Sequence, residues 1–135
     1  EALAFLLMAL AVVCRMTVFS QSAIYRNNAL MNANGFALGM AGVIFGLFNG
    51  SFVGGFFKTG YKIARPFVFF IITCFVVIFL SEALHYVPGL EKLNAFGMDN
   101  MALQLILFIA GIFFYLCLTV LSCKKACERF EKIDL

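Results

Sequence analysis

Charged residues are scarce in this chain. They make up 13% of the residues, whereas 64% of the residues are apolar and the mean hydropathy is +1.01. Soluble domains are close to half apolar and carry about one quarter charged residues. A chain this poor in charge has the composition of a protein that is embedded in a membrane.

Groups that carry out chemistry are also few. Glu82 and His85 match one Glu-x-x-His pair of a di-iron site, but such a site needs a second pair and further carboxylates, and the chain has one histidine. A surface pair at the lipid boundary is the other interpretation. No Ser/His/Asp or Cys/His set has a suitable spacing, and no G-x-x-x-x-G-K-[ST] motif is present to hold ATP. We therefore expect no catalytic residues, no metal site, no bound cofactor and no enzyme activity.

Long apolar runs take up almost two-thirds of the chain, at residues 2–20, 35–57, 66–87 and 101–122. Each run is long enough to cross a hydrocarbon layer of about 30 Å at about 1.5 Å per residue. The sequence predicts an all-α fold, a bundle of four transmembrane helices in one domain of residues 1–135. Residues 123–135 are predicted to form a cytoplasmic helical tail. No room is left for a soluble catalytic domain.

The basic residues are distributed unequally around these runs. Only Arg26 and Lys92 lie on one side, whereas the other side holds Lys58, Lys62, Arg65, Lys124, Lys125, Arg129 and Lys132. Cytoplasmic loops are the ones enriched in Lys and Arg, so both termini and the 58–65 turn are predicted to be cytoplasmic. We expect a multi-pass protein of the plasma or inner cell membrane. Since the charges border membrane segments, the predicted partner is membrane lipid and not nucleic acid.

The second run contains a row of glycines at every fourth position, Gly42, Gly46, Gly50 and Gly54. At about 100° per residue, this spacing places them along one slowly drifting face of a helix. A soluble helix would lose roughly 0.8–1 kcal/mol per glycine. In a bilayer a bare glycine face allows another helix to approach closely. The row therefore predicts a helix-packing surface, used within the chain or by a partner.

Polar side chains inside the apolar runs are candidates for a translocation path: Arg15, Asn49 and Gln104. An intramembrane polar residue is a functional candidate because burying it in lipid is costly. Alternatives remain open. Arg15 reaches the headgroups with its long stem or meets Glu82, and Asn49 forms a hydrogen bond between packed helices.

Two segments resemble type-2 ATP-binding-cassette (ABC) exporter permeases. The sequence FFKTGYKIARPF at 56–67 is similar to the cytoplasmic turn between the fourth and fifth helices of that family. The C-terminal segment SCKKACERFEKIDL, at 122–135, is similar to the C-terminal segment of many such permeases. The matching residues are Phe130, Glu131, Lys132, Asp134 and Leu135.

The resemblance implies that this chain corresponds to the third to sixth helices of a six-helix permease. It departs from the family in lacking the first two helices and the coupling helix. The first apolar run also has no basic flank before it, so we expect a piece of a longer protein. The family works as a dimer with two ATPase subunits, which implies a second permease, identical or different, and an ATPase as partners.

From the resemblance and the residues together, we expect a membrane-spanning exporter subunit that forms the substrate path. ATP hydrolysis is expected in a separate subunit, with Lys58, Lys62 and Arg65 as candidate contacts that couple to it. Two alternatives follow from the glycine row. One is an oligomeric channel packed through glycines, and the other is a structural or assembly subunit of a larger membrane complex.

Overall fold

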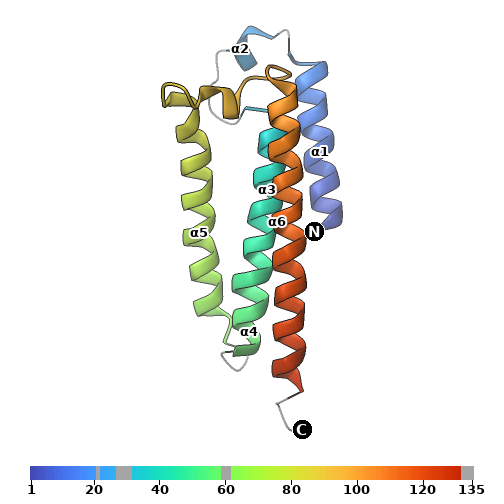
Figure 1. Cartoon of the computed structure of the whole chain (residues 1–135), viewed down its shortest axis with the longest axis vertical. Coiled ribbons are helices and arrows are strands. Elements are labelled where there is room, and N and C mark those ends of the chain that lie inside the picture. The colour runs from blue at the N-terminus through green and yellow to red at the C-terminus, as the bar shows by residue number, and fades with distance from the viewer. Residues whose placement is uncertain (21, 27–31, 59–61, 132–135) are drawn as a thin grey trace.

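The computed structural model describes residues 1–20, 22–26, 32–58 and 62–131, and every regular element among them is helical. The predicted all-α class is therefore confirmed. Four helical stretches run side by side in Figure 1. They are α1 (Ala2–Thr17), α3 (Gly35–Phe48) with its continuation, α5 (Ala64–Ala83) and α6 (Met101–Phe130). Shorter helices, α2 (Ala23–Arg26), η2 (Leu84–Tyr86) and η3 (Glu91–Asn94), join them at one end.

Three of the helical stretches are long and apolar enough to cross a membrane, Gly35–Phe56, Ala64–Tyr86 and Met101–Phe130. These three fit a membrane location. The first predicted helix, 2–20, ends earlier, at Thr17. Ser20 donates a hydrogen bond to the carbonyl oxygen of Thr17 and satisfies a group at the helix end. With 16 residues, α1 is about 24 Å long, shorter than the hydrocarbon layer.

The other predicted helices differ from the structure mainly at their ends. The run 66–87 corresponds to α5 and η2, which begin two residues earlier, at Ala64. The run 101–122 extends without a break through the first part of the predicted tail, as α6 ends at Phe130. Residues 132–135 of that tail lie outside the described residues.

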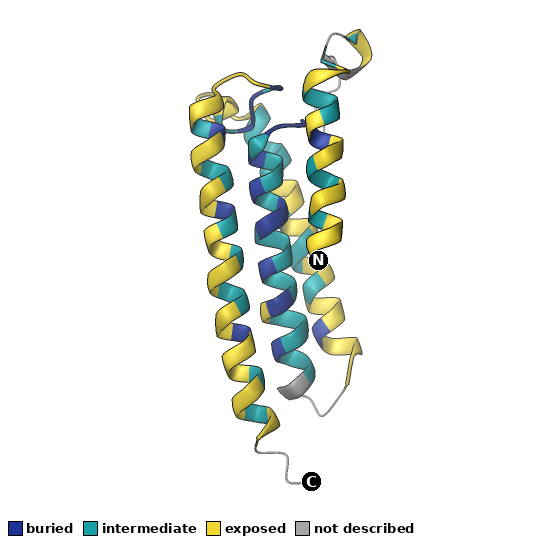
Figure 2. Cartoon of the chain, turned by 90° about the vertical axis from the view of Figure 1, so that its right-hand side faces the viewer, coloured by how far each residue is buried: buried dark blue, intermediate teal, exposed yellow. Residues whose placement is uncertain are grey.

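Helix α3 is central, because it contacts α1, α5 and α6. Figure 2 shows that buried residues gather on α3, whereas α1 and α6 present mostly exposed ones. In the candidate spans of α5 and α6, only 6% and 11% of the residues are buried. The large apolar side chains thus face outward, where lipid is as apolar as they are. Helix association in that setting depends on close packing and on interhelical hydrogen bonds.

The predicted helix 35–57 is interrupted by one wider turn. After α3 the chain forms the π-helical segment η1 (Asn49–Val53) and then α4 (Gly54–Lys58). A glycine row at four-residue spacing drifts by about 40° per step around an α-helix. A π turn holds more residues per turn, which offsets this drift. Gly50 and Gly54 therefore stay on the side of α3 and α4 that faces α6.

Buried carboxamides hold the loops at the end of the bundle where α3 and α6 begin. We call it the amide end, after Asn32, Asn34, Asn94 and Gln104, all of them buried. Asn34 caps α3, since its Oδ1 accepts a hydrogen bond from the Ala37 N–H at 2.8 Å. Its Nδ2 donates to Asn94 Oδ1 at 2.9 Å and to the Ala95 carbonyl at 2.7 Å. The cap of α3 thereby also fixes the loop that leads into α6.

Gln104 makes the matching set of contacts from α6. Its Oε1 accepts a hydrogen bond from the Gly35 N–H at 2.8 Å, and its Nε2 donates to the carbonyls of Gly97 and Asp99 at 3.1 and 2.6 Å. Buried polar groups stabilise a fold only when they are hydrogen-bonded. Asn34 and Gln104 meet that condition and set the register of α3 against α6.

Candidate functional site

An amphipathic groove lies beside α3, between α1 and α5. Its volume is about 410 Å³, within the range of ligand-binding pockets, roughly 300–1,000 Å³. The polar lining residues all lie toward the amide end: Arg15, Asn32, Ser81, Glu82 and Asn94. The rest of the lining is apolar, and includes Met8, Val12, Phe36, Met40, Ile44 and Val77. The groove therefore offers charged and amide groups at one end and a hydrocarbon surface along its length.

Asn32 is one of two buried asparagines that line the groove, at 4% exposed, and the other is Asn94, at 2%. Asn32 Nδ2 donates to the carbonyl oxygen of Asn94 at 3.0 Å. Its Oδ1 accepts no hydrogen bond from the described part of the chain. A buried acceptor left without a donor costs about 1–3 kcal/mol, so this oxygen is suited to a donor group on a bound molecule.

The three candidates for a translocation path do not lie together. Arg15 lines the groove. Gln104 is 2% exposed and is committed to the hydrogen bonds of the amide end. Asn49 lies between helices, where its Nδ2 donates to Thr119 Oγ1 at 2.9 Å and to the Glu1 carboxylate at 3.3 Å. Only Arg15 of the three is placed on the groove, because the two amides are used in helix contacts.

The glycines of α3 lie against α6, with the closest contacts nearer the amide end than the predicted row. A Cβ built on Gly39 would lie 2.7 Å from the Leu107 carbonyl oxygen, and one on Gly42 would lie 3.0 Å from that of Gly111. A Cβ on Gly111 would overlap the carbonyl of Gly39. Backbone touches backbone here, so any side chain would separate the helices.

The contact loosens along the predicted row. A Cβ on Gly46 would lie 3.1 Å from Tyr115 Cα, and one on Gly50 would lie 3.8 Å from Ser122 Oγ. At Gly54 it would meet nothing within 4 Å. Within the chain, Gly42 and Gly46 of the predicted row pack tightly against α6, and Gly50 is in ordinary contact with Ser122. Gly54 does not take part in this packing, and a role for it in packing against a partner stays a prediction. Helices α4 and α6 diverge at that level, which leaves space beside Gly54.

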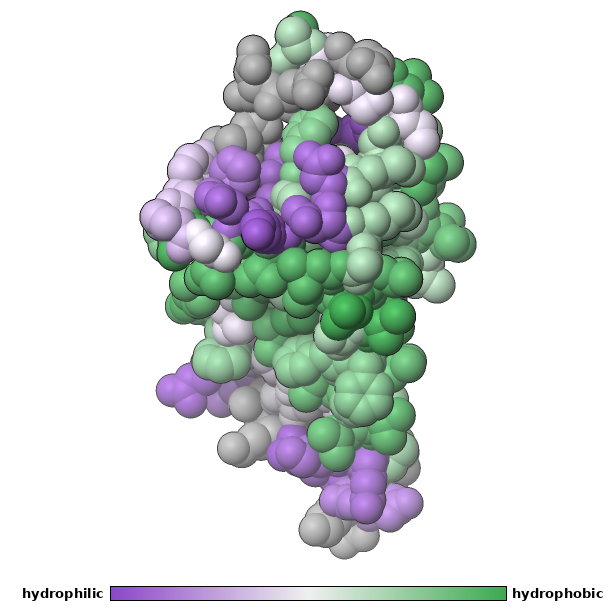
Figure 3. Space-filling view, turned by 45° about the horizontal axis from the view of Figure 1, so that its top comes forward, coloured by the Kyte–Doolittle hydropathy of each residue, from purple (hydrophilic) through white to green (hydrophobic). Residues whose placement is uncertain are grey.

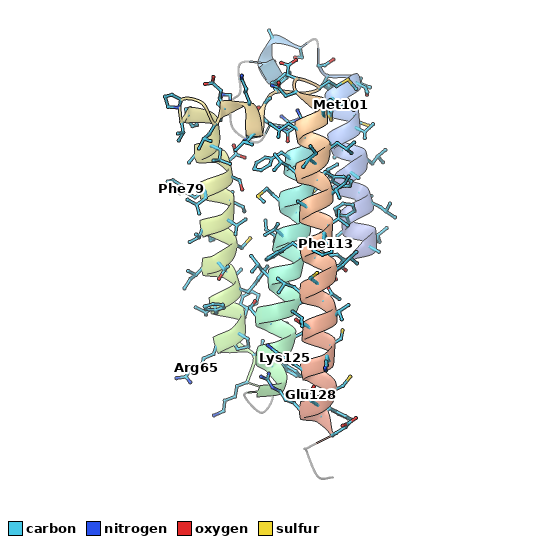
Figure 4. The ribbon with its side chains drawn as sticks, viewed as in Figure 1. Arg65, Phe79, Met101, Phe113, Lys125 and Glu128 are labelled. Carbon is cyan, nitrogen blue, oxygen red and sulfur yellow. The ribbon has the colours of Figure 1, made fainter. Side chains whose placement is uncertain are left out.

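The predicted coupling residues lie near that space. Arg65 begins α5 and Lys62 precedes it, both of them exposed, and the side chain of Lys58 lies outside the described residues. Figure 4 shows Arg65 at the same end of the bundle as Lys125. We call this the basic end, after Lys62, Arg65, Lys124, Lys125 and Arg129. In Figure 3 a hydrophobic band separates it from the hydrophilic residues of the opposite end.

Glu82 and His85 follow one another on the last turns of α5 and η2. Glu82 lines the groove. Among the described residues, no three His, Cys, Asp or Glu side chains group closely enough to hold a metal ion.

Sequence reasoning missed three residues that define these sites: Asn32, Gly39 and Gly111. Gly39 was missed because a strict four-residue row was followed, whereas the tight contacts at Gly35, Gly39, Gly42 and Gly46 alternate steps of four and three. That alternation keeps residues on one helix face, and it could have identified Gly39 as a packing residue from the sequence. Gly111 was missed because it stands alone in α6 and its partner, Gly39, is far away in the sequence. Nothing in the local sequence distinguishes Asn32 from its neighbouring asparagines, because its burial depends on Asn94.

Comparison with known proteins found no matching family model, no similar curated protein and no similar solved structure.

Proposed function

We propose that this chain is a membrane-spanning subunit of an ABC-type exporter, which binds an amphipathic substrate and works with a separate ATPase. The observation that carries the proposal is the groove between α1, α3 and α5. An amphiphile fits its lining, with a polar headgroup at Arg15, Glu82 and Asn32 and an apolar body along Met40 and the neighbouring side chains.

The charge distribution supports the cytoplasmic orientation in this proposal. The described basic residues at the α5 start and the α6 end gather at one end of the bundle, which the positive-inside rule assigns to the cytoplasm. With that orientation the proposal assigns both termini to the cytoplasm, and the membrane is the plasma or inner cell membrane. It counts α1 as a fourth span, of which the structure contains only a part, because Glu1 contacts Asn49 and Tyr115 partway along the bundle. Lys58, Lys62 and Arg65 then face the compartment that contains ATP.

A channel assembled through the glycine row is less well supported. The tight part of the row, around Gly39 and Gly42, is covered by α6 of the same chain. A second copy therefore has no access to it. The exposed apolar faces of α5 and α6 stay available for a second permease, as a dimer requires.

The complex purified from its native membrane in mild detergent provides the first test. We expect native mass spectrometry to show two permease chains, identical or different, bound to two ATP-hydrolysing chains. A ring of four or more copies without an ATPase would support the channel instead. One copy in a larger assembly without an ATPase would support a structural subunit.

The groove itself is tested by filling it. Met40→Trp places a large side chain in the groove, whereas Phe113→Trp introduces the same side chain on α6 at a residue that is 67% exposed. The measurement is ATP-dependent transport of a fluorescent single-chain phospholipid into inverted vesicles. We expect Met40→Trp to reduce it by about tenfold, corresponding to about 1.4 kcal/mol, with little effect of the control. Equal transport in both variants would show that the groove is not the substrate site.

A further inference from the structure

A second cavity lies at the basic end, where α4 and α6 diverge. Its volume is about 490 Å³. Three basic side chains line it, Arg65 from α5 and Lys125 and Arg129 from α6, and its described lining contains no acidic residue. Its other walls are largely apolar, formed by Pro66, Phe69, Leu118 and Leu121.

The helices beside this cavity are linked by a hydrogen bond. Arg129 Nη1 donates a hydrogen bond to the carbonyl oxygen of Gly54 and so bridges α6 and α4. Ser122, 5% exposed, also lines the cavity. Neither Arg65 nor Lys125 is paired with a carboxylate of the described part of the chain. Like charges grouped without a counter-charge raise the affinity of the cavity for an anion.

The depth of the cavity matches the level of lipid headgroups. About 20 helical residues span the hydrocarbon layer, so a span that starts at Met101 leaves the hydrocarbon near Leu121. Lys125 and Arg129 follow by one and two turns. The apolar wall lies within the hydrocarbon, since Phe69 and Leu121 are 63% and 52% exposed. The cavity thus places cations at the headgroup level directly beside an open apolar face.

We propose that this cavity binds an anionic phospholipid of the cytoplasmic leaflet. The phosphate lies among Arg65, Lys125 and Arg129, and one acyl chain runs along Phe69 and Leu121. Basic pockets between transmembrane helices on the cytoplasmic side are suited to such headgroups. The N-terminus of α5, which begins at Ala64, adds a favourable partial positive charge. The bound lipid fills the space that the diverging helices leave, and the proposal is independent of any transport activity.

A carboxylate of a partner protein is an alternative occupant of the cavity, because it has the same charge as the phosphate. The lipid is favoured because the cavity continues into the apolar surface, which an acyl chain fills and an acidic protein side chain does not. The experiment below separates these two occupants.

The test measures phospholipid that stays bound to the full chain, purified from its native membrane with its accompanying chains. Native mass spectrometry is performed after incubation with phosphatidylglycerol or phosphatidylcholine. We expect retention of phosphatidylglycerol and not of phosphatidylcholine. Lys125→Gln should reduce retention by about fivefold, and Arg65→Gln with Lys125→Gln by about 30-fold, from about 1 kcal/mol per basic side chain.

Matched controls remove the same charge at the same end of the bundle. Lys124→Gln is adjacent in sequence and does not line the cavity, and Lys62→Gln with Lys124→Gln matches the double variant. Both should retain phosphatidylglycerol as the parent does. Equal loss in site and control variants would overturn the proposal, because it would indicate attraction by general surface charge. In the Lys125→Gln variant, retained lipid together with loss of a bound protein would also overturn it, in favour of a carboxylate contact.

A further arm separates a phospholipid from a free phosphate. Glycerol phosphate at the same concentration should not displace the lipid, because it lacks the acyl chain, and displacement would overturn the proposal. If a variant fails to fold, a phospholipid with a photoreactive acyl chain is used on the parent protein. Crosslinks to the 66–69 and 118–121 segments support the site, and crosslinks confined to other helices overturn it.

Discussion

The contact of α3 and α4 with α6 has two halves that behave differently. From Gly35 to Gly46 the backbones touch, with Gly39 against Leu107 and Gly42 against Gly111. From Gly50 to Gly54 the same pair of helices separates, and a Cβ on Gly54 would meet nothing within 4 Å. Glycine at four-residue spacing is present in both halves. Glycine therefore permits close approach without enforcing it.

The difference arises from the groups that fasten each half. At the amide end, Gln104 donates to two carbonyls and accepts from the N–H of Gly35, which draws the start of α3 onto α6. At the basic end the described chain offers the Arg129–Gly54 hydrogen bond across a cavity lined by like charges. Polar contacts in a low-dielectric setting strengthen the packing of the first half, which we call the closed half. We call the second half, where the cavity lies beside the helices, the open half.

The largest expected effect comes from a methyl group in the closed half. Gly111→Ala should destabilise the fold by about 3 kcal/mol or more, since the new Cβ overlaps the Gly39 carbonyl and the backbones must separate. Thermal unfolding in detergent measures the change. Unchanged unfolding would mean that the helices are not in backbone contact.

A smaller loss is expected from the amide end. Asn34→Ala removes the cap of α3 and leaves the Asn94 and Ala95 oxygens without that donor, at a cost of about 2 kcal/mol. The control is Asn100→Gly at the start of α6, where the asparagine makes no capping hydrogen bond and has φ of 55°. The two variants are compared by the same unfolding assay. Equal losses would show that the amide contacts do not fasten the closed half.

The smallest effect is expected in the open half. Gly54→Ala adds a methyl group to free space, and alanine favours a helix over glycine by about 0.8–1 kcal/mol. We expect unchanged or slightly increased stability, measured beside Gly111→Ala. A loss comparable to that of Gly111→Ala would remove the distinction between the two halves.

Much of the helical arrangement was predictable from local patterns. Apolar runs gave the helices to within a few residues at most ends, because length and hydropathy act locally. Thr17, where α1 ends, was not predicted, since Val18 and Phe19 continue the apolar pattern past the helix. The π turn at Asn49–Val53 was not predicted either, because nothing in the residue types marks it.

The candidate site was predictable only in part. Arg15 stood out because arginine is rare inside an apolar run, and it lines the groove. Asn49 and Gln104 stood out for the same reason, but their partners, Thr119 and the Gly35 backbone, are about 70 residues away in sequence. Polarity alone does not distinguish a residue that binds a ligand from one that fastens two helices.

The sequence by itself determined the helical class, the apolar exterior and the separation of positive charge, because each depends on composition and on residues close together in the chain. Only the tertiary structure decided which glycines touch another backbone, which amides are used up in hydrogen bonds, and where α4 leaves α6 to open the basic cavity. Those outcomes depend on the distance between helices, and that distance is set by contacts between residues far apart in the sequence.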